Sequence, residues 1–307
     1  MPGQTYRYRT HGLTLDSDIE LPELVRADAA PDILVRTGRV ADALDGPVVR
    51  GPGYQAARGE FLLDVPGVAR YAVTGGNRVT VDPLPSAAPS DVRVYLFASA
   101  MAALLHQRGL FALHASAVEI DGRCVLFAGD SGTGKSTLTA AFHDRGCRVI
   151  TDDIAIVSFD DAGRPVVHPG YRQLRLAADS LEHAGHTLGA PLGVRNGKQK
   201  LTFHVPGAPV PGPVRPVKMF LLTRRTRDTV HLRDLAGHQR VMGVVRATYR
   251  RRILAAVGRR ADHFERCAAL AHAIDISEVE RPASLTLLGD LVDALERDVR
   301  AIAAAHV

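Results

Sequence analysis

Cysteine is scarce in this sequence. Its three cysteines, Cys124, Cys147 and Cys267, lie far apart among 307 residues, and no two of them form a C-x-x-C pair. This spacing supports neither a zinc site nor a disulfide framework. We expect isolated buried thiols in a reducing compartment, because free cysteine behaves as a small apolar residue.

Long hydrophobic runs are also missing. The apolar stretches are far shorter than the roughly 18 residues that a membrane span requires. The opening residues MPGQTYRYRTHG contain no apolar segment of the kind found in a signal peptide. We therefore expect no membrane partner and a cytoplasmic location.

Several catalytic signatures are absent as well. The sequence HAGH (183–186) lacks the glutamate of H-E-x-x-H, so we expect no metal site there. No G-x-S-x-G nucleophile elbow occurs, and neither an internal repeat nor a low-complexity segment is visible. Tryptophan is absent while proline is common, with 18 residues, which points to many turns.

The overall composition is that of a soluble globular protein, with 46% hydrophobic and 23% charged residues. The net charge of +5 is mild, whereas nucleic-acid binders gather basic residues on one face with aromatics between them. The dense cluster YRRRILAAVGRR (249–260) has helical spacing. We favour a solvated helix face over a site for an acidic partner, and we expect no nucleic-acid partner.

The organisation of the chain suggests two parts. Residues 1–90 contain short alternating runs, with a Gly-Gly turn at 74–77, and predict a β-rich N-terminal domain. A connector at 85–90 precedes a helical pattern over 91–109. Residues 91–307 then form the predicted catalytic domain.

The predicted elements of the second part alternate between strands and helices. Two strands joined by Asp-Gly at 121–122 lead into a helix over 136–146 and a further strand. Beyond them we expect a helical piece over 174–184, a buried strand from 216, two helices within 236–275, and a closing amphipathic helix over 284–305.

The strongest signal is GDSGTGKST, which fits the phosphate-binding pattern G-x-x-x-x-G-K-[ST] between a strand and a helix. Glycines let the backbone aim its N–H groups at a polyphosphate, and the helix N-terminus adds a positive partial charge. Lysine would reach the β and γ phosphates, and the serine hydroxyl would hold Mg²⁺. The predicted nucleotide-binding residues are Gly129, Asp130, Ser131, Gly132, Thr133, Gly134, Lys135, Ser136 and Thr137.

An acid pair and a histidine surround this loop in the sequence. Asp152 and Asp153 follow Ser136 after one helix and one strand, a path that returns the chain to the phosphate loop. Kinases need a metal ligand and benefit from a carboxylate that accepts the hydroxyl proton, so one acid could serve each task. The pair could instead begin a turn. His114 lies across the predicted hairpin from the loop, where it could contact phosphate or an acid, or be structural.

Together these residues resemble a known family. The segment from His114 to Asp153 is similar, without gaps, to the catalytic core of bacterial HPr kinase/phosphorylase. The resemblance implies an α/β fold with a mixed sheet, like that of phosphoenolpyruvate carboxykinases, and implies ATP and Mg²⁺ as cofactors. It further implies that Asp153 is the general base toward a serine, with Asp152 as its acidic neighbour, that Ser136 binds the metal, and that His114 and Lys135 are active-site residues. We expect Asp152 to hold the metal together with Ser136.

The resemblance fades after about residue 160. The family's downstream glutamate signature, which supplies a second metal ligand, has no clear counterpart here. The opening YRYRTHGLTLDSDIELPEL and the short layout resemble HPr-kinase relatives of ribosomal-peptide pathways, including lasso peptides. We therefore expect a serine kinase acting on a peptide or small protein. The ring-like assemblies of HPr kinases also make self-association conceivable.

Three alternatives stay open at this point. The chain could be a nucleotide-binding regulatory protein without transfer activity, an ATPase coupled to another process, or an HPr kinase proper. Basic residues that could neutralise charge during transfer are numerous, and Lys200 and Arg172 are candidates for phosphate or substrate contacts. The full set of such cations is Arg172, Arg175, Lys198, Lys200, Arg224 and Arg225.

Overall fold

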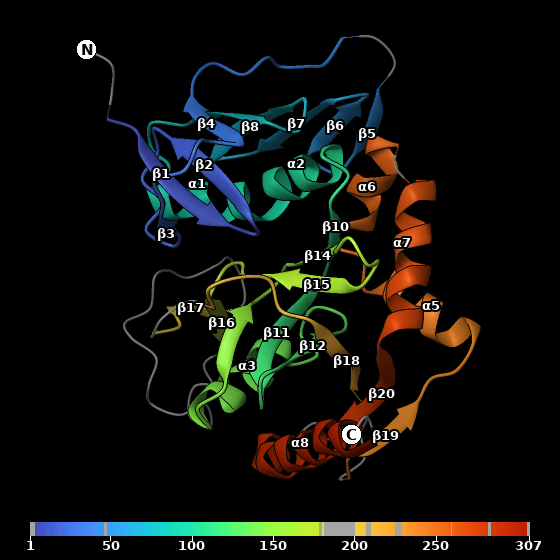
Figure 1. The fold of residues 1–307 in the computed structure, drawn as a ribbon. Helices are drawn as coiled ribbons and strands as arrows, with labels where there is room; N and C mark the ends of the chain where they lie inside the picture. Colours follow the sequence, from blue (N-terminus) through green and yellow to red (C-terminus); the bar gives the residue numbers. More distant parts are fainter. Residues whose placement is uncertain are drawn as a thin grey trace. The chain divides into compact units, whose positions relative to one another are not determined.

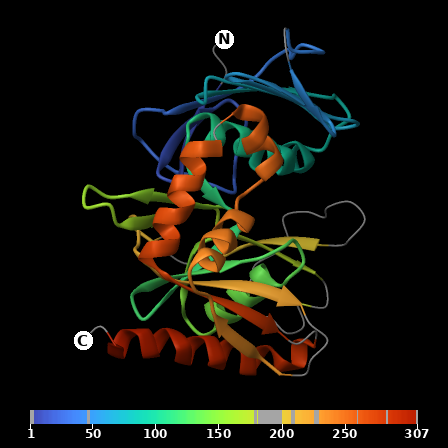
Figure 2. The same cartoon turned by 90° about the vertical axis from the view of Figure 1, so that its right-hand side faces the viewer.

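The computed structural model describes residues 4–45, 48–177, 180, 200–206, 210–224, 229–258, 260–281 and 284–305. The chain divides into two compact units (Figures 1 and 2). The first comprises residues 1–112 and 249–265, and the second comprises residues 113–248 and 266–307. The expected boundary near residue 90 coincides with the change from strands to helices, and the helices that follow it belong to the first unit.

The first unit is built on a mixed sheet of nine described strands, in the order β3-β1-β2-β4-β9-β8-β7-β6-β5. Alternation of buried and less buried residues along β8 and β9 shows that one face is more fully covered than the other. The predicted Gly-Gly turn joins these two strands. The strands are β1 (Tyr6–Thr10), β2 (Leu13–Ser17), β3 (Val25–Arg26), β4 (Ile33–Thr37), β5 (Val49–Gly51), β6 (Tyr54–Ala57), β7 (Glu60–Val65), β8 (Ala69–Thr74) and β9 (Arg78–Pro83).

Helices cover this sheet. The predicted helix over 91–109 is observed as α1 (Pro89–Tyr95), a π-helical turn at Leu96–Ala100 and α2 (Met101–Gln107), which contact β7 and β8. In α6 (Arg251–Val257), Ile253 and Leu254 are buried while Arg251 and Arg252 are exposed. Helix α6 therefore presents a basic face to solvent, as predicted from the sequence.

The second unit contains a six-stranded sheet in the order β13-β11-β12-β18-β20-β19. The pairs β12–β18 and β18–β20 are parallel and the others are antiparallel, so the fold is α/β with a mixed sheet, as expected. A three-stranded sheet in the order β10-β14-β15 and a two-stranded sheet of β16 and β17 are separate from it. The strands from residue 111 onward are β10 (Phe111–Leu113), which spans the boundary between the units, β11 (Ala115–Ile120), β12 (Arg123–Ala128), β13 (Arg148–Thr151), β14 (Ala155–Phe159), β15 (Pro165–His168), β16 (Gln173–Ala177), β17 (Lys200–His204), β18 (Pro216–Arg224), β19 (His231–Asp234) and β20 (Asp275–Arg281).

Helices α3 (Lys135–Asp144) and α8 (Leu288–Ala305) contact each other and share one face of the six-stranded sheet. Their apolar side chains form one buried cluster with β11, β12, β18 and β20. Phe127 of β12 stacks on Phe142 of α3, with ring centroids 5.3 Å apart. This core holds the start of α3 firmly beside the end of β12.

Two helix predictions were wrong. The segment 173–177 is strand β16 rather than the start of a helix, since Leu174 and Leu176 alternate into the core and the strand pairs with β17. The remainder of that predicted helix lies outside the described residues, apart from Ser180. The region 236–275 holds three helices, α5 (His238–Arg246), α6 and α7 (Arg260–Ala273), because the chain turns at Arg250 and Gly258, both with positive φ.

The cysteines are free, as expected. Cys124 and Cys267 are buried and Cys147 is half-buried. Burial raises the pKa of the Cys267 thiol to about 12, so this side chain behaves as a neutral apolar group. Within the described residues, no helix combines the length and hydrophobicity needed to cross a bilayer.

Candidate phosphate-transfer site

The phosphate-binding loop connects β12 to α3. Gly129 has φ of 148° and Gly134 has φ of 95°, both in the region that favours glycine. A Cβ on Gly129 would lie 2.6 Å from the carbonyl oxygen of Leu222, so the neighbouring strand leaves no room for a side chain. The Thr133 hydroxyl donates to the Asp130 carbonyl at 2.8 Å and closes the loop.

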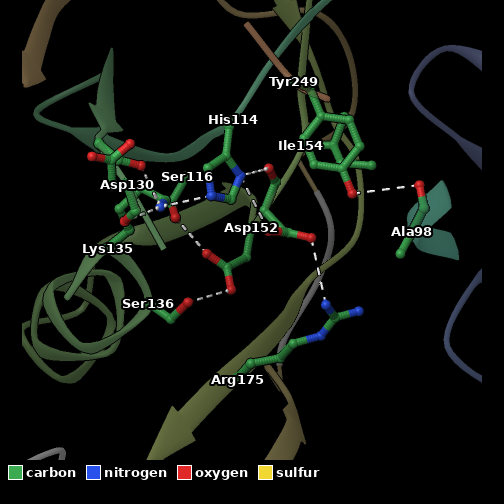
Figure 3. A network of polar contacts seen from close by, with 12 residues as sticks. Ala98, His114, Ser116, Asp130, Lys135, Ser136, Asp152, Ile154, Arg175 and Tyr249 are labelled. Carbon is green, nitrogen blue, oxygen red and sulfur yellow. Dashed lines mark hydrogen bonds and ion pairs between the residues drawn. The ribbon is translucent and has the colours of Figure 1, made fainter. Parts of the chain in front are cut away.

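Lys135, the first residue of α3, folds back over the loop (Figure 3). Its Nζ donates to the carbonyl oxygens of Gly129 at 2.7 Å and Asp130 at 3.2 Å. The same ammonium group lies 3.0 Å from Nε2 of His114. An ammonium group has no acceptor capacity, so Nε2 accepts and the imidazole carries its proton on Nδ1.

Asp152 is a buried carboxylate held by two hydroxyl groups (Figure 3). Ser116 donates to its Oδ1, and Ser136 donates to its Oδ2 at 2.9 Å. The residue is 1% exposed. Burial raises the pKa of Asp152, the neighbouring Asp153 adds to this rise, and the two serine hydroxyls oppose it.

Asp153 has a different set of partners and a more open position. Its Oδ1 lies 3.3 Å from His114 Nδ1, which also approaches the Asp153 carbonyl oxygen at 3.1 Å. Its Oδ2 lies 3.5 Å from Nη1 of Arg175 on β16. The Asp153 side chain is 28% exposed. Its φ of 68° is unusual for a residue other than glycine and turns the two neighbouring carboxylates in different directions.

No protein-family model matches this chain, and no curated protein does. Among solved structures, the chain is similar to one described as the HPr(Ser) kinase/phosphatase from Coxiella burnetii. The identity is 15% over 64% of this chain and 97% of that chain, with a TM-score of 0.33. A match at this level supports no argument about fold or function.

The donor set beside the loop fits a magnesium ion. Magnesium takes oxygen ligands and is commonly held by one or two carboxylates together with substrate phosphates. Asp152 and Ser136 supply such oxygens next to the phosphate-binding loop. No group of three or more His, Cys, Asp or Glu side chains in the described part of the chain is arranged to hold a metal. Phosphate oxygens and water would supply further ligands to a metal held there.

The structure brings together most of the residues singled out in the sequence. His114, Lys135, Ser136, Asp152 and Asp153 form one network (Figure 3). Their proximity is as predicted, while their roles stay predictions. Within the loop, Ser131 and Gly132 are exposed, and Thr137 donates from α3 to Ser180 at 3.2 Å.

The predicted cations divide into three groups. Arg175 reaches Asp153. Arg172 is 8% exposed, and burial lowers the pKa of its guanidinium group. Lys200 begins β17 and Arg224 ends β18, but the side chains of both lie outside the described part. Lys198, Arg225 and the sequence HAGH also lie outside the described residues.

Two residues of the site escaped the sequence reasoning. Ser116 follows His114 by two positions, and its hydroxyl donates to Asp152 while His114 contacts Asp153, so the sequence H-x-S carried a usable signal. Arg281 ends β20 and donates from Nε to the Thr133 carbonyl oxygen. Its guanidinium group lies 2.8 Å from the point where a Cβ on Gly134 would sit. Strand order, which brings β20 near the loop, could not be read from the sequence.

The buried charge on Asp152 predicts a gain in stability when it is removed. Because the folded-state pKa of Asp152 is raised, its ionisation lowers stability as pH rises above the ordinary value of 3.8. We expect Asp152→Asn to raise the melting temperature by about 2–4 °C at pH 8, corresponding to roughly 1 kcal/mol, and to have little effect near pH 4.

Thermal unfolding without nucleotide or metal at the two pH values measures this difference. The asparagine amide can donate to one serine hydroxyl while its oxygen accepts from the other, so the hydrogen bonds are preserved. Asp161→Asn, in an exposed turn, serves as the control and should leave the melting temperature unchanged. A lower melting temperature for Asp152→Asn at pH 8 would contradict the expectation.

Proposed function

We propose that this protein is an ATP-dependent kinase that transfers the γ-phosphate to a serine hydroxyl of a peptide or small protein. One observation carries the proposal: two adjacent carboxylates beside a phosphate-binding loop have different partners and different exposure. Asp152 is buried among hydroxyl groups, as suits a metal ligand. Asp153 is accessible and paired with His114, as suits a group that exchanges a proton with a substrate.

In this proposal, residues 129–137 bind the triphosphate through backbone N–H groups and the N-terminus of α3. Lys135 exchanges the carbonyl oxygens of Gly129 and Asp130 for the β and γ phosphates. Ser136 and Asp152 hold Mg²⁺, which when bound neutralises charge on the phosphate oxygens. We also propose that the core around this loop is of the phosphoenolpyruvate-carboxykinase-like kinase type.

Asp153 then acts as the base. The serine oxygen attacks the γ-phosphorus, the bond between the γ-phosphorus and the β–γ bridging oxygen breaks, and ADP leaves. The serine proton passes to Asp153, whose carboxylate is oriented by His114 Nδ1. Arg175 offers a cation on the far side of Asp153 for the acceptor or the transferring phosphate.

The acceptor class follows from the sequence resemblance. The short HPr-kinase relatives of ribosomal-peptide pathways suggest that the acceptor is a serine of a precursor peptide, such as a lasso precursor. A cytoplasmic location is also part of this proposal. HPr itself is the less favoured acceptor, since the family's downstream glutamate signature has no clear counterpart in this sequence.

Transfer of label from γ-³²P-ATP tests the proposal. The purified chain is incubated with MgATP and short peptides encoded beside its gene, and phosphoserine is located by mass spectrometry. We expect label on a serine peptide and none on its Ser→Ala counterpart. Tight ATP binding without any labelled peptide would favour a regulatory protein, and phosphate release independent of peptide would favour an ATPase.

A further inference from the structure

Gln173 is a buried polar residue on β16. Leu174 and Leu176 of this strand point into the apolar core under α3, so alternation places Gln173 and Arg175 on the opposite face. Gln173 is 9% exposed. Glutamine is mostly found at protein surfaces, so its burial here calls for a physical reason.

The amide nitrogen of Gln173 has no hydrogen-bond partner among the described residues. Its Nε2 is fully buried and makes no hydrogen bond to any residue that the structure describes. Buried side-chain donors are nearly always paired, and an unpaired one lowers stability. The NH₂ group can be satisfied by an acceptor oxygen that arrives with a ligand.

Gln173 lies between two residues that contact the acid pair. The Tyr171 carbonyl oxygen accepts the Asp152 N–H at 2.7 Å. The Arg175 guanidinium group lies 3.5 Å from Asp153 Oδ2. Gln173 and Arg175 are two positions apart on β16 and share one side of the strand, so the unpaired amide lies on the side from which Arg175 reaches Asp153.

We propose that Gln173 binds the terminal phosphoryl group of the nucleoside triphosphate, with Nε2 donating to a non-bridging oxygen. This inference rests on the function proposed above. An anionic phosphoryl oxygen is a stronger acceptor than a neutral serine hydroxyl, and hydrogen bonds to charged acceptors are the stronger ones. An amide also supplies its donor without adding a second cation beside Arg175. Gln173 is thus a residue that distinguishes triphosphate from diphosphate.

Gln173→Met tests this role, because methionine has a similar shape and no donor. Calorimetric titration with MgATP and MgADP, in the absence of any peptide, gives the two affinities. We expect the affinity for MgATP to fall about tenfold, since one charge-assisted hydrogen bond is lost, while that for MgADP changes less than twofold. The melting temperature of the nucleotide-free variant should equal or exceed that of the parent, because an unpaired buried donor is removed.

Gln239→Met makes the same change at an exposed position of α5 and should alter neither affinity. Gln173→Glu keeps the shape but replaces the donor with an anion, so it should weaken MgATP binding more than Gln173→Met does. Equal MgATP and MgADP effects, or none, in the folded Gln173→Met variant would overturn the inference. Because no peptide is used, this result does not depend on kinase activity. If the parent protein transfers no phosphate, the proposed kinase function is wrong. The ratio of the MgATP and MgADP affinities still tests the role of Gln173.

Discussion

Replacing Asp153 by asparagine is expected to lower the rate of phosphoryl transfer by a factor of about 10² to 10⁴, the range typical of a lost general base. The amide of asparagine cannot accept the serine proton at neutral pH, whereas its size and shape match those of aspartate. The backbone should tolerate the change, because φ is 68° at this position and asparagine is among the residues that adopt that conformation most readily.

ATP binding should survive the same substitution. Asp153 is linked to the loop through His114, which lies between it and Lys135. We expect the MgATP affinity of Asp153→Asn to stay within about threefold of the parent value, which corresponds to well under 1 kcal/mol. Rates are measured by label transfer to the peptide and affinities by calorimetry.

Asp161→Asn is the matched control for the rate measurement, since it makes the same chemical change in an exposed turn of the second unit. It should leave transfer unaltered. Parental transfer by Asp153→Asn, with equal ATP binding, would exclude Asp153 as the base. Loss of both ATP binding and transfer would instead show that Asp153 supports the loop.

The site could be predicted from the sequence wherever its residues lie close together along the chain. Gly129 to Thr137 form one continuous loop and helix start, and Asp152 returns to that loop after a single helix and strand. His114 precedes the hairpin strand β11, which is paired with β12, so its position opposite Gly129 follows from a two-residue turn. These local paths leave little freedom of placement.

The residues that were missed depend on long-range packing. Arg281 reaches Thr133 because β20 is parallel to β18 and β18 is parallel to β12, an order that local patterns do not encode. Gln173, for which phosphate binding is proposed above, was not singled out, because the adjacent residues 174–184 were interpreted as a helix. In the structure, β16 pairs with β17, and this pairing overrides the local helical preference. The side chains of Leu174 and Leu176 then point into the core, and that of Gln173 points to the other face.

The N-terminal part illustrates the same limit. Short alternating runs predicted strands, and the turn at 74–77 was placed correctly between β8 and β9. The joining of nine strands into one sheet was beyond sequence reasoning, because β4 pairs in parallel with both β2 and β9 across long connections. The inclusion of residues 249–265 in this unit is likewise a result of packing between distant segments.

Gly129→Ala is expected to cause the largest loss of nucleotide binding among changes that leave every charge in place. The added methyl group would lie 2.6 Å from the Leu222 carbonyl oxygen and 2.9 Å from the Thr133 hydroxyl. Because Leu222 lies in the centre of the sheet, on β18, the backbone of the loop must move instead. A strained non-glycine conformation costs about 1–3 kcal/mol by itself, so we expect MgATP affinity to fall by about 100-fold or more.

Alanine substitutions at two other glycines distinguish the effect of backbone strain from the effect of contact with β18. Gly132 in the same loop has φ of 89° but open space around its Cβ position, so Gly132→Ala should show the conformational cost alone, about a tenfold loss of affinity. Gly289 of α8 has neither restriction, and Gly289→Ala should leave binding unchanged while stabilising the helix by up to about 1 kcal/mol. Calorimetry with MgATP on all three variants gives the order. If Gly129→Ala binds MgATP as tightly as Gly132→Ala does, contact with β18 does not hold the loop in its binding conformation. The loop would then adopt that conformation only when the nucleotide binds.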